Sequence, residues 1–78
     1  MFTVSQIRVG SKVNILSSNE FVHEVTAIYS DMSKVKTGMA PFPGFTATCN
    51  RDPDGVYCGW IEENGPHYMS EVKKIASY

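Results

Sequence analysis

The sequence has no long hydrophobic run and no excess of charge of either sign. No window approaches the roughly 18 apolar residues of a membrane span, and the N-terminus lacks the basic start and apolar core of a signal peptide. Seven Lys and Arg against eight Asp and Glu give a net charge of −1. No strong field therefore attracts nucleic acid or anionic lipid. We expect a soluble, cytoplasmic protein that does not bind a membrane.

Helical periodicity is also missing, and several enzyme motifs are missing with it. No stretch shows the apolar spacing of an amphipathic α-helix of normal length, so no glycine-rich loop opens a helix to cradle a phosphate. His23 and His67 are the only histidines, and neither has a recognisable partner pattern for a nucleophile and its base. We therefore expect that the protein is not an enzyme and uses no cofactor.

Short β-type segments separated by turns make up the chain instead. Alternating, β-branched and aromatic residues predict strands at residues 7–16, 21–30, 45–51, 56–62 and 72–75. Residues 34–36 suggest a short edge strand flanked by lysines, and residues 68–71 a single 3₁₀ turn before the last strand. A chain of 78 residues forms one small domain. We predict a single all-β domain over residues 1–78, a five-stranded antiparallel barrel, because closure removes exposed edges.

A hairpin over residues 45–62 is the clearest element. Its turn signal is the run DPDG at 52–55, where Pro presets φ and Gly accepts a positive φ. A four-residue loop predicts the pairs Arg51–Val56, Cys49–Cys58, Ala47–Trp60 and Phe45–Glu62. One face then carries Trp60 and both cysteines, so we expect that face to be the core side. The run ENGP at 63–66 predicts a second turn.

The two cysteines and the acidic turn are candidate metal ligands. Cys49, Cys58 and His67 have a C-x8-C-x8-H spacing, whereas structural zinc sites usually use a tight C-x2–4-C pair. The 52–55 run has its Gly too early for a calcium loop and lies between strands. We interpret the cysteines as small buried hydrophobic side chains and expect no metal. A cross-strand disulfide between Cys49 and Cys58 is the alternative in an oxidising environment.

Several of these segments resemble the prokaryotic type of SH3-like small barrel. The run VGSKVNIL at 9–16 looks like the first strand of that group, and residues 24–29 resemble the second. Trp60-Ile61 and residues 70–75 look like its last strand pair, joined through a 3₁₀ turn. Within the group, residues 10–16 are similar to the small stromal subunit family of photosystem I, and KOW-type domains share the first-strand pattern. The resemblance implies an SH3-like barrel. The sequence lacks the acidic-aromatic run of the SH3 domains that bind proline-rich peptides.

The loop MAPFP at residues 39–43 is the predicted binding element. Prolines reduce the entropy that a loop loses on binding, and Phe and Met are typical interface anchors. Two alternatives stay open for Phe42: an exposed ring, or a ring that folds back to plug the barrel end. The outer-face residues of the hairpin extend the same apolar patch. The predicted partner-binding residues are Met39, Pro41, Phe42, Pro43, Tyr57 and Ile61.

These observations favour a small protein-binding module that acts as an accessory subunit, adaptor or inhibitor. Its size alone suggests a phage-encoded modulator of a host enzyme. The alternative is a KOW-like domain for single-stranded nucleic acid, in which tyrosines stack on bases and lysines contact phosphates. The near-neutral charge balance favours the protein partner over nucleic acid.

Overall fold

The computed structural model describes the backbone of residues 1–15, 18–51 and 57–78, and the side chains of residues 1–15, 22–49 and 64–78. The strands are β1 (Lys12–Ile15), β2 (Ser18–Tyr29), β3 (Gly44–Arg51), β4 (Tyr57–Tyr68) and β5 (Val72–Ser77). Three 3₁₀ turns accompany them: η1 (Val4–Gln6), η2 (Met32–Lys34) and η3 (Met69–Glu71). The strands form one antiparallel sheet in the order β4-β3-β2-β1-β5. The all-β class and the 3₁₀ turn before the last strand are confirmed.

β1 forms where the alternation predicts a strand. Gly10 has a φ of 96°, which only glycine adopts readily, so the chain turns sharply there before the strand starts. Val25 of β2 closes the turn, because its carbonyl accepts from Gly10 N at 2.8 Å and its N–H donates to Ser11 O at 2.9 Å. Val13 and Ile15 are fully buried while Lys12 is exposed. The half-buried pattern therefore directs one face of β1 into the core.

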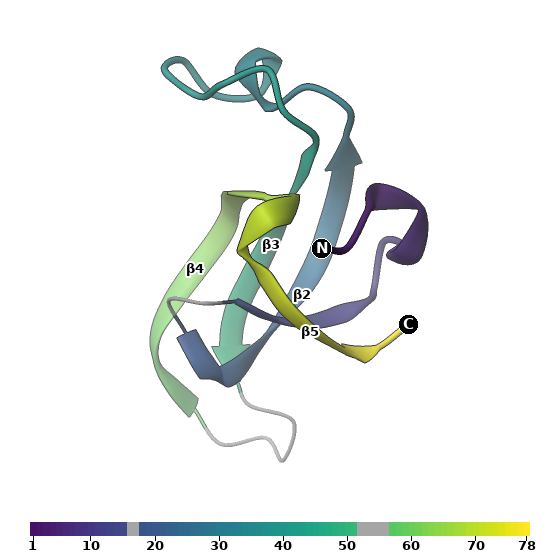
Figure 1. Ribbon diagram of the computed structural model, residues 1–78. Coiled ribbons are helices and arrows are strands. Elements are labelled where there is room, and N and C mark those ends of the chain that lie inside the picture. The colour runs from purple at the N-terminus through teal and green to yellow at the C-terminus, as the bar shows by residue number, and fades with distance from the viewer. Residues whose placement is uncertain (16–17, 52–56) are drawn as a thin grey trace.

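The sheet curls, so that strands which are not neighbours in it share one core. β2 is twelve residues long and pairs with both β1 and β3, and irregular register between Val25 and Ala27 bends it. In Figure 1, β5 crosses in front of β2 and β3. Val72 of β5 packs in the same buried cluster as Val25 and Phe45. The cluster comprises Ile7, Val13, Val25, Phe45, Ala47, Met69 and Val72.

The predicted register of the hairpin is wrong, although the inward face of its first strand is confirmed. Phe45, Ala47 and Cys49 of β3 are all buried, as the alternation predicts. The observed pairs are Phe45–His67, Ala47–Gly65, Cys49–Glu62 and Arg51–Tyr57, in place of Phe45–Glu62, Ala47–Trp60, Cys49–Cys58 and Arg51–Val56. Irregular register on both sides of Cys49 lets β4 take up extra residues. The side chains of Cys58 and Trp60 lie outside the described residues, so the burial of Trp60 stays a prediction.

The second predicted turn is also wrong, because β4 continues through residues 63–66. Asn64 has a φ of 52°, a left-handed conformation that Asn tolerates better than most residues. Pro66 is accommodated because β4 is an edge strand, where a missing N–H need not break a ladder. The turn-forming residues therefore bend a strand rather than end one.

Residues 34–36 do not form the expected edge strand. Asp31 caps η2 by accepting a hydrogen bond from Ser33 N at 2.9 Å, and the N–H groups of Val35 and Lys36 donate to Met32 O at 3.0 and 3.3 Å. The Met32 side chain is fully buried beneath this turn. Local capping therefore outweighs the polar-apolar-polar alternation. No helix in the described parts of the chain is long and apolar enough to cross a membrane.

Candidate functional site

The loop before β3 is held in one conformation by backbone hydrogen bonds. Phe42 O accepts from Met32 N at 2.9 Å, and Phe42 N donates to Ala40 O at 2.8 Å. Pro43 O accepts from Met69 N at 3.1 Å, and Ala40 N donates to the Tyr68 hydroxyl at 2.6 Å. These contacts tie the loop to η2 on one side and to the end of β4 on the other. The loop is therefore ordered before any partner arrives.

Phe42 projects from this ordered loop toward solvent. Its side chain is 60% exposed, and its ring meets the Tyr68 ring edge-on at a centroid distance of 6.1 Å. Met32 and Phe45, both fully buried, occupy the interior on this side instead. Of the two alternatives for Phe42, the structure therefore shows the exposed ring, and Phe42 does not plug the core.

Gly44 explains why the loop can enter β3 so close to the core. A Cβ at this position would overlap with the backbone oxygen of His67 and the side chain of Met32. Only glycine leaves room for both. The loop thereby lies directly against the end of β4.

An apolar groove of about 430 Å³ lies beside Phe42. Three segments that are distant in the sequence form its walls: the N-terminal residues, the end of the loop, and the junction of β4 with η3. The lining residues are Met1, Phe2, Thr3, Val4, Phe42, Pro43, Tyr68, Met69 and Ser70. None of these side chains carries a charge. The lining side chains are therefore suited to apolar groups.

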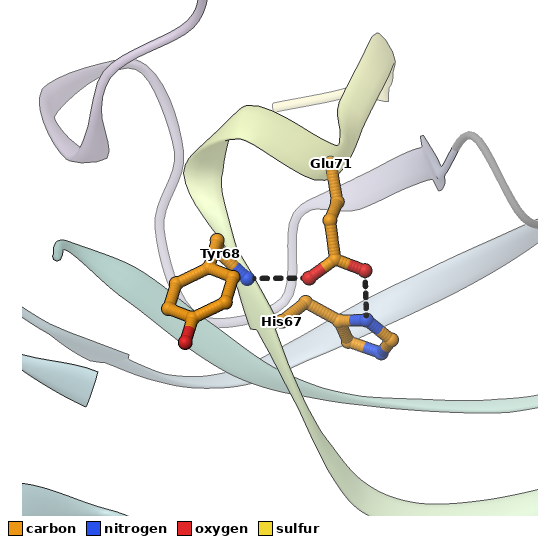
Figure 2. Close-up of polar contacts among 3 residues, drawn as sticks. All are labelled: His67, Tyr68 and Glu71. Atoms are coloured by element: carbon orange, nitrogen blue, oxygen red, sulfur yellow. Dashed lines mark hydrogen bonds and ion pairs between the residues drawn. The ribbon is translucent and has the colours of Figure 1, made fainter. Parts of the chain in front are cut away.

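A polar network fixes the wall formed by Tyr68 and Met69 (Figure 2). One Glu71 carboxylate oxygen accepts from Tyr68 N at 2.7 Å, and the other lies 3.3 Å from His67 Nδ1. The buried His67 ring meets the buried His23 ring edge-on at 5.6 Å and lies against Phe45 at 5.5 Å. Glu71 therefore links the buried ring of His67 to the backbone of Tyr68, which lines the groove.

The predicted binding residues are only partly brought together. Phe42 and Pro43 line the groove, while Pro41 is exposed and Met39 half-buried on the same loop. The side chains of Tyr57 and Ile61 lie outside the described residues, so their place in the patch stays a prediction. Sequence reasoning missed Phe2, Val4 and Met69 as lining residues. The apolar N-terminal run MFTV was the available signal.

The position of Cys49 differs from the one on which the metal and disulfide alternatives were based. Cys49 is a buried thiol whose partner position on β4 is Glu62 rather than Cys58. Cys58 itself lies outside the described residues. Among the residues that the structure describes, no group of three or more His, Cys, Asp or Glu side chains is placed to hold a metal ion.

Some of the basic residues of the nucleic-acid alternative lie on two neighbouring strands of the sheet. Lys12, Lys73 and Lys74 are exposed on β1 and β5. Tyr78 is occupied by a cation–π contact, with the Arg8 guanidinium 4.5 Å from its ring centroid. Its ring therefore already carries a stacking partner.

Fold and site together define a small all-β protein with one curled antiparallel sheet and an apolar groove beside an exposed phenylalanine. The chain matches no known family model, no curated protein and no solved structure. Its function is therefore argued from the site alone.

Proposed function

We propose that this protein is a small non-enzymatic module that binds another protein through Phe42 and the adjoining groove, as an accessory subunit, adaptor or inhibitor. One observation carries the proposal: a large aromatic side chain is 60% exposed on a loop that four hydrogen bonds hold in place. An exposed ring on a mobile loop is common. An exposed ring on an ordered loop beside an apolar groove is typical of an interface anchor.

Energetic considerations support the same proposal. Fully burying a Phe side chain contributes about 1.5–3 kcal/mol, and much of Phe42 remains to be buried. A preordered loop loses little conformational entropy on binding, so less of that gain is cancelled. Pro41 and Pro43 restrict the loop further.

The proposal includes an SH3-like small barrel that works in the cytoplasm. The shared packing of Val72 with Val25 and Phe45 supports closure, because it brings β5 over the core face of β2 and β3. Nuclear Overhauser contacts between β4 and β5 would establish the closed barrel, and their absence in a well-resolved spectrum would leave an open curled sheet. Fractionation of the source cells tests the location.

The decisive experiment compares Phe42→Ala with Val9→Ala. Val9 is 63% exposed on a turn outside the groove, so the control removes exposed apolar surface elsewhere, although a smaller amount of it. Partners are captured with the tagged protein, identified by mass spectrometry, purified, and measured against each variant. We expect Phe42→Ala to weaken the complex by more than about 1 kcal/mol and Val9→Ala to leave its affinity unchanged.

Equal affinities for both variants would contradict the proposal. The KOW-like alternative gains support if single-stranded DNA or RNA binds instead, with an affinity that falls steeply with salt. In that case Lys73→Ala and Lys74→Ala, rather than Phe42→Ala, would weaken binding.

A further inference from the structure

One pair of residues in β4, Asn64 and Gly65, has a chemistry that the proposed function does not use. It is the only place in the sequence where an asparagine precedes a glycine. The register with β3 is irregular next to the pair, where one residue of β3 lies opposite two of β4. Asn64 is exposed and has a φ of 52°. The pair therefore lies at a bulge on the surface of the protein.

An asparagine side chain can react with the backbone of the residue that follows it. The nitrogen of the next peptide bond loses its proton to base and bonds to the side-chain carbon Cγ. The bond from Cγ to the side-chain nitrogen breaks, and that nitrogen leaves as ammonia. Water then opens the cyclic imide at either carbonyl, which gives aspartate or isoaspartate. Glycine at the second position favours the attack because it has no side chain to hinder it.

In the folded protein, the ladder with β3 restrains the attacking nitrogen. The backbone N–H groups along a strand point alternately to its two sides. Pro66 has no N–H, and Tyr68 N donates to Glu71 at 2.7 Å rather than to β3. By the same alternation, Gly65 N points toward Ala47, its partner in β3. The reaction therefore requires that this part of β4 separates from β3.

That separation is a local event, because β4 lies at one edge of the sheet (Figure 1). Only the ladder with β3 has to open, and local openings cost less free energy than global unfolding. The irregular register next to Asn64 already interrupts this ladder. Gly65 N is therefore released from time to time in protein that stays folded elsewhere.

We propose that Asn64 is a site of spontaneous deamidation, in which Gly65 N displaces the side-chain nitrogen while β4 is locally open. The product carries one more negative charge than the original chain, directly after Glu62 and Glu63. In isoaspartate the backbone also runs through the former side chain and is one carbon longer. The longer backbone no longer matches the pairs that Gly65 and His67 form with β3, so the modification weakens the attachment of β4.

The test follows the purified protein during incubation in mildly alkaline buffer. Samples are separated by charge, digested and sequenced by mass spectrometry, and isoaspartate is detected with an isoaspartate-specific methyltransferase. We expect a more acidic species to accumulate, with a mixture of aspartate and isoaspartate at position 64. Asn14 is the internal control, because the β-branched Ile15 follows it and hinders the same attack.

Two variants at position 64 separate the added charge from the longer backbone. Asn64→Gly retains a residue that readily adopts a positive φ, and it should form no acidic species. Freshly prepared Asn64→Asp has the charge of the product with a normal backbone. We expect aged wild-type protein enriched in isoaspartate to melt at a lower temperature than Asn64→Asp, because only isoaspartate lengthens the strand.

Urea tests the opening step. The incubation is repeated at urea concentrations below the unfolding midpoint and in urea that unfolds the protein. We expect conversion of Asn64 to quicken with urea even below the midpoint, because urea favours the open form of β4.

Three outcomes would overturn the inference. One is an intact Asn64 in native buffer by the time the unfolded protein has converted, and another is conversion of Asn64 no faster than that of Asn14. The third is the same acidic species in Asn64→Gly, which would place the reaction elsewhere in the chain. The proposed function is tested separately, by the effect of Phe42→Ala on an identified partner.

Discussion

At the scale of single residues, Asp31 determines how the chain leaves β2. Its carboxylate accepts hydrogen bonds from the Ser33 hydroxyl at 2.5 Å and from Ser33 N at 2.9 Å. These bonds favour the charged carboxylate, so the pKa of Asp31 is lowered from its ordinary value of 3.8, with the Ser33 hydroxyl as the largest cause and Lys34 adding a smaller one. Through η2, this cap also positions Met32 N, to which the Phe42 carbonyl is bound.

The lowered pKa gives a pH dependence whose sign is defined. Because the folded-state pKa of Asp31 lies below the unfolded value, its contribution to stability is present above about pH 3.8 and is lost as the pH falls through the folded-state pKa. We expect the carboxyl carbon of Asp31 to titrate by NMR with a midpoint below 3.8. Ser33→Ala should move that midpoint upward, since the strongest donor is removed.

Asp31→Asn supplies the control for this prediction. Its amide oxygen can still accept from Ser33 N, but it does not titrate. The difference in melting temperature between the two proteins should therefore shrink as the pH falls below 3.8. A difference that stays constant down to pH 2 would show that the Asp31 charge makes no contribution.

At the scale of elements, η3 joins the last two strands and carries the groove wall. Glu71 bonds Tyr68 N at 2.7 Å and lies 3.3 Å from His67 Nδ1. Loss of a capping side chain of this kind costs about 0.5–2 kcal/mol. We expect Glu71→Ala to lower the free energy of unfolding by about 1 kcal/mol in denaturant titrations.

Glu71→Gln separates the hydrogen bond from the charge. A glutamine retains an acceptor for Tyr68 N, so its stability should stay within about 0.5 kcal/mol of the wild type. If the glutamine variant is as unstable as the alanine variant, then the charge of Glu71, rather than the cap, supports the turn.

The elements also show what the sequence can and cannot predict. The burial of Val13, Ile15 and Phe45 follows from simple alternation, because a side-chain period of two is fixed by strand geometry. The register of β4 does not follow, since one inserted residue changes every later pair and a conformation such as that of Asn64 has no clear sequence signal. The prediction of an edge strand at residues 34–36 was wrong for a different reason, because Asp31 caps a 3₁₀ turn there.

The groove was harder to predict than any single element. Its walls come from the N-terminus, the loop at 39–43 and the start of η3, and only the curl of the sheet brings them together. The composition of the 39–43 loop did point to Phe42, because proline and aromatic residues without polar neighbours are costly to leave exposed unless they bind. Met69 could not be identified in this way, since a buried methionine is ordinary in any core.

At the scale of the whole molecule, stability and binding depend on different aromatic residues. A domain of 78 residues is stable by only about 4–12 kcal/mol, so one large core side chain is a substantial part of its stability. Phe45 is fully buried in the central cluster, whereas Phe42, three positions earlier, is 60% exposed. The same substitution at the two positions therefore separates the two roles.

We expect Phe45→Ala to destabilise the protein by about 3–5 kcal/mol, because it leaves a cavity among close-packed side chains. Phe42→Ala should change the free energy of unfolding by no more than about 0.5 kcal/mol, since its ring lies mostly in solvent. Urea titrations of both variants, followed by circular dichroism, measure the difference. If Phe42→Ala destabilises the protein as much as Phe45→Ala does, Phe42 is part of the core and its assignment as a binding anchor is wrong. If it loses the partner while keeping the wild-type midpoint, the exposed ring is retained for binding and the fold does not depend on it.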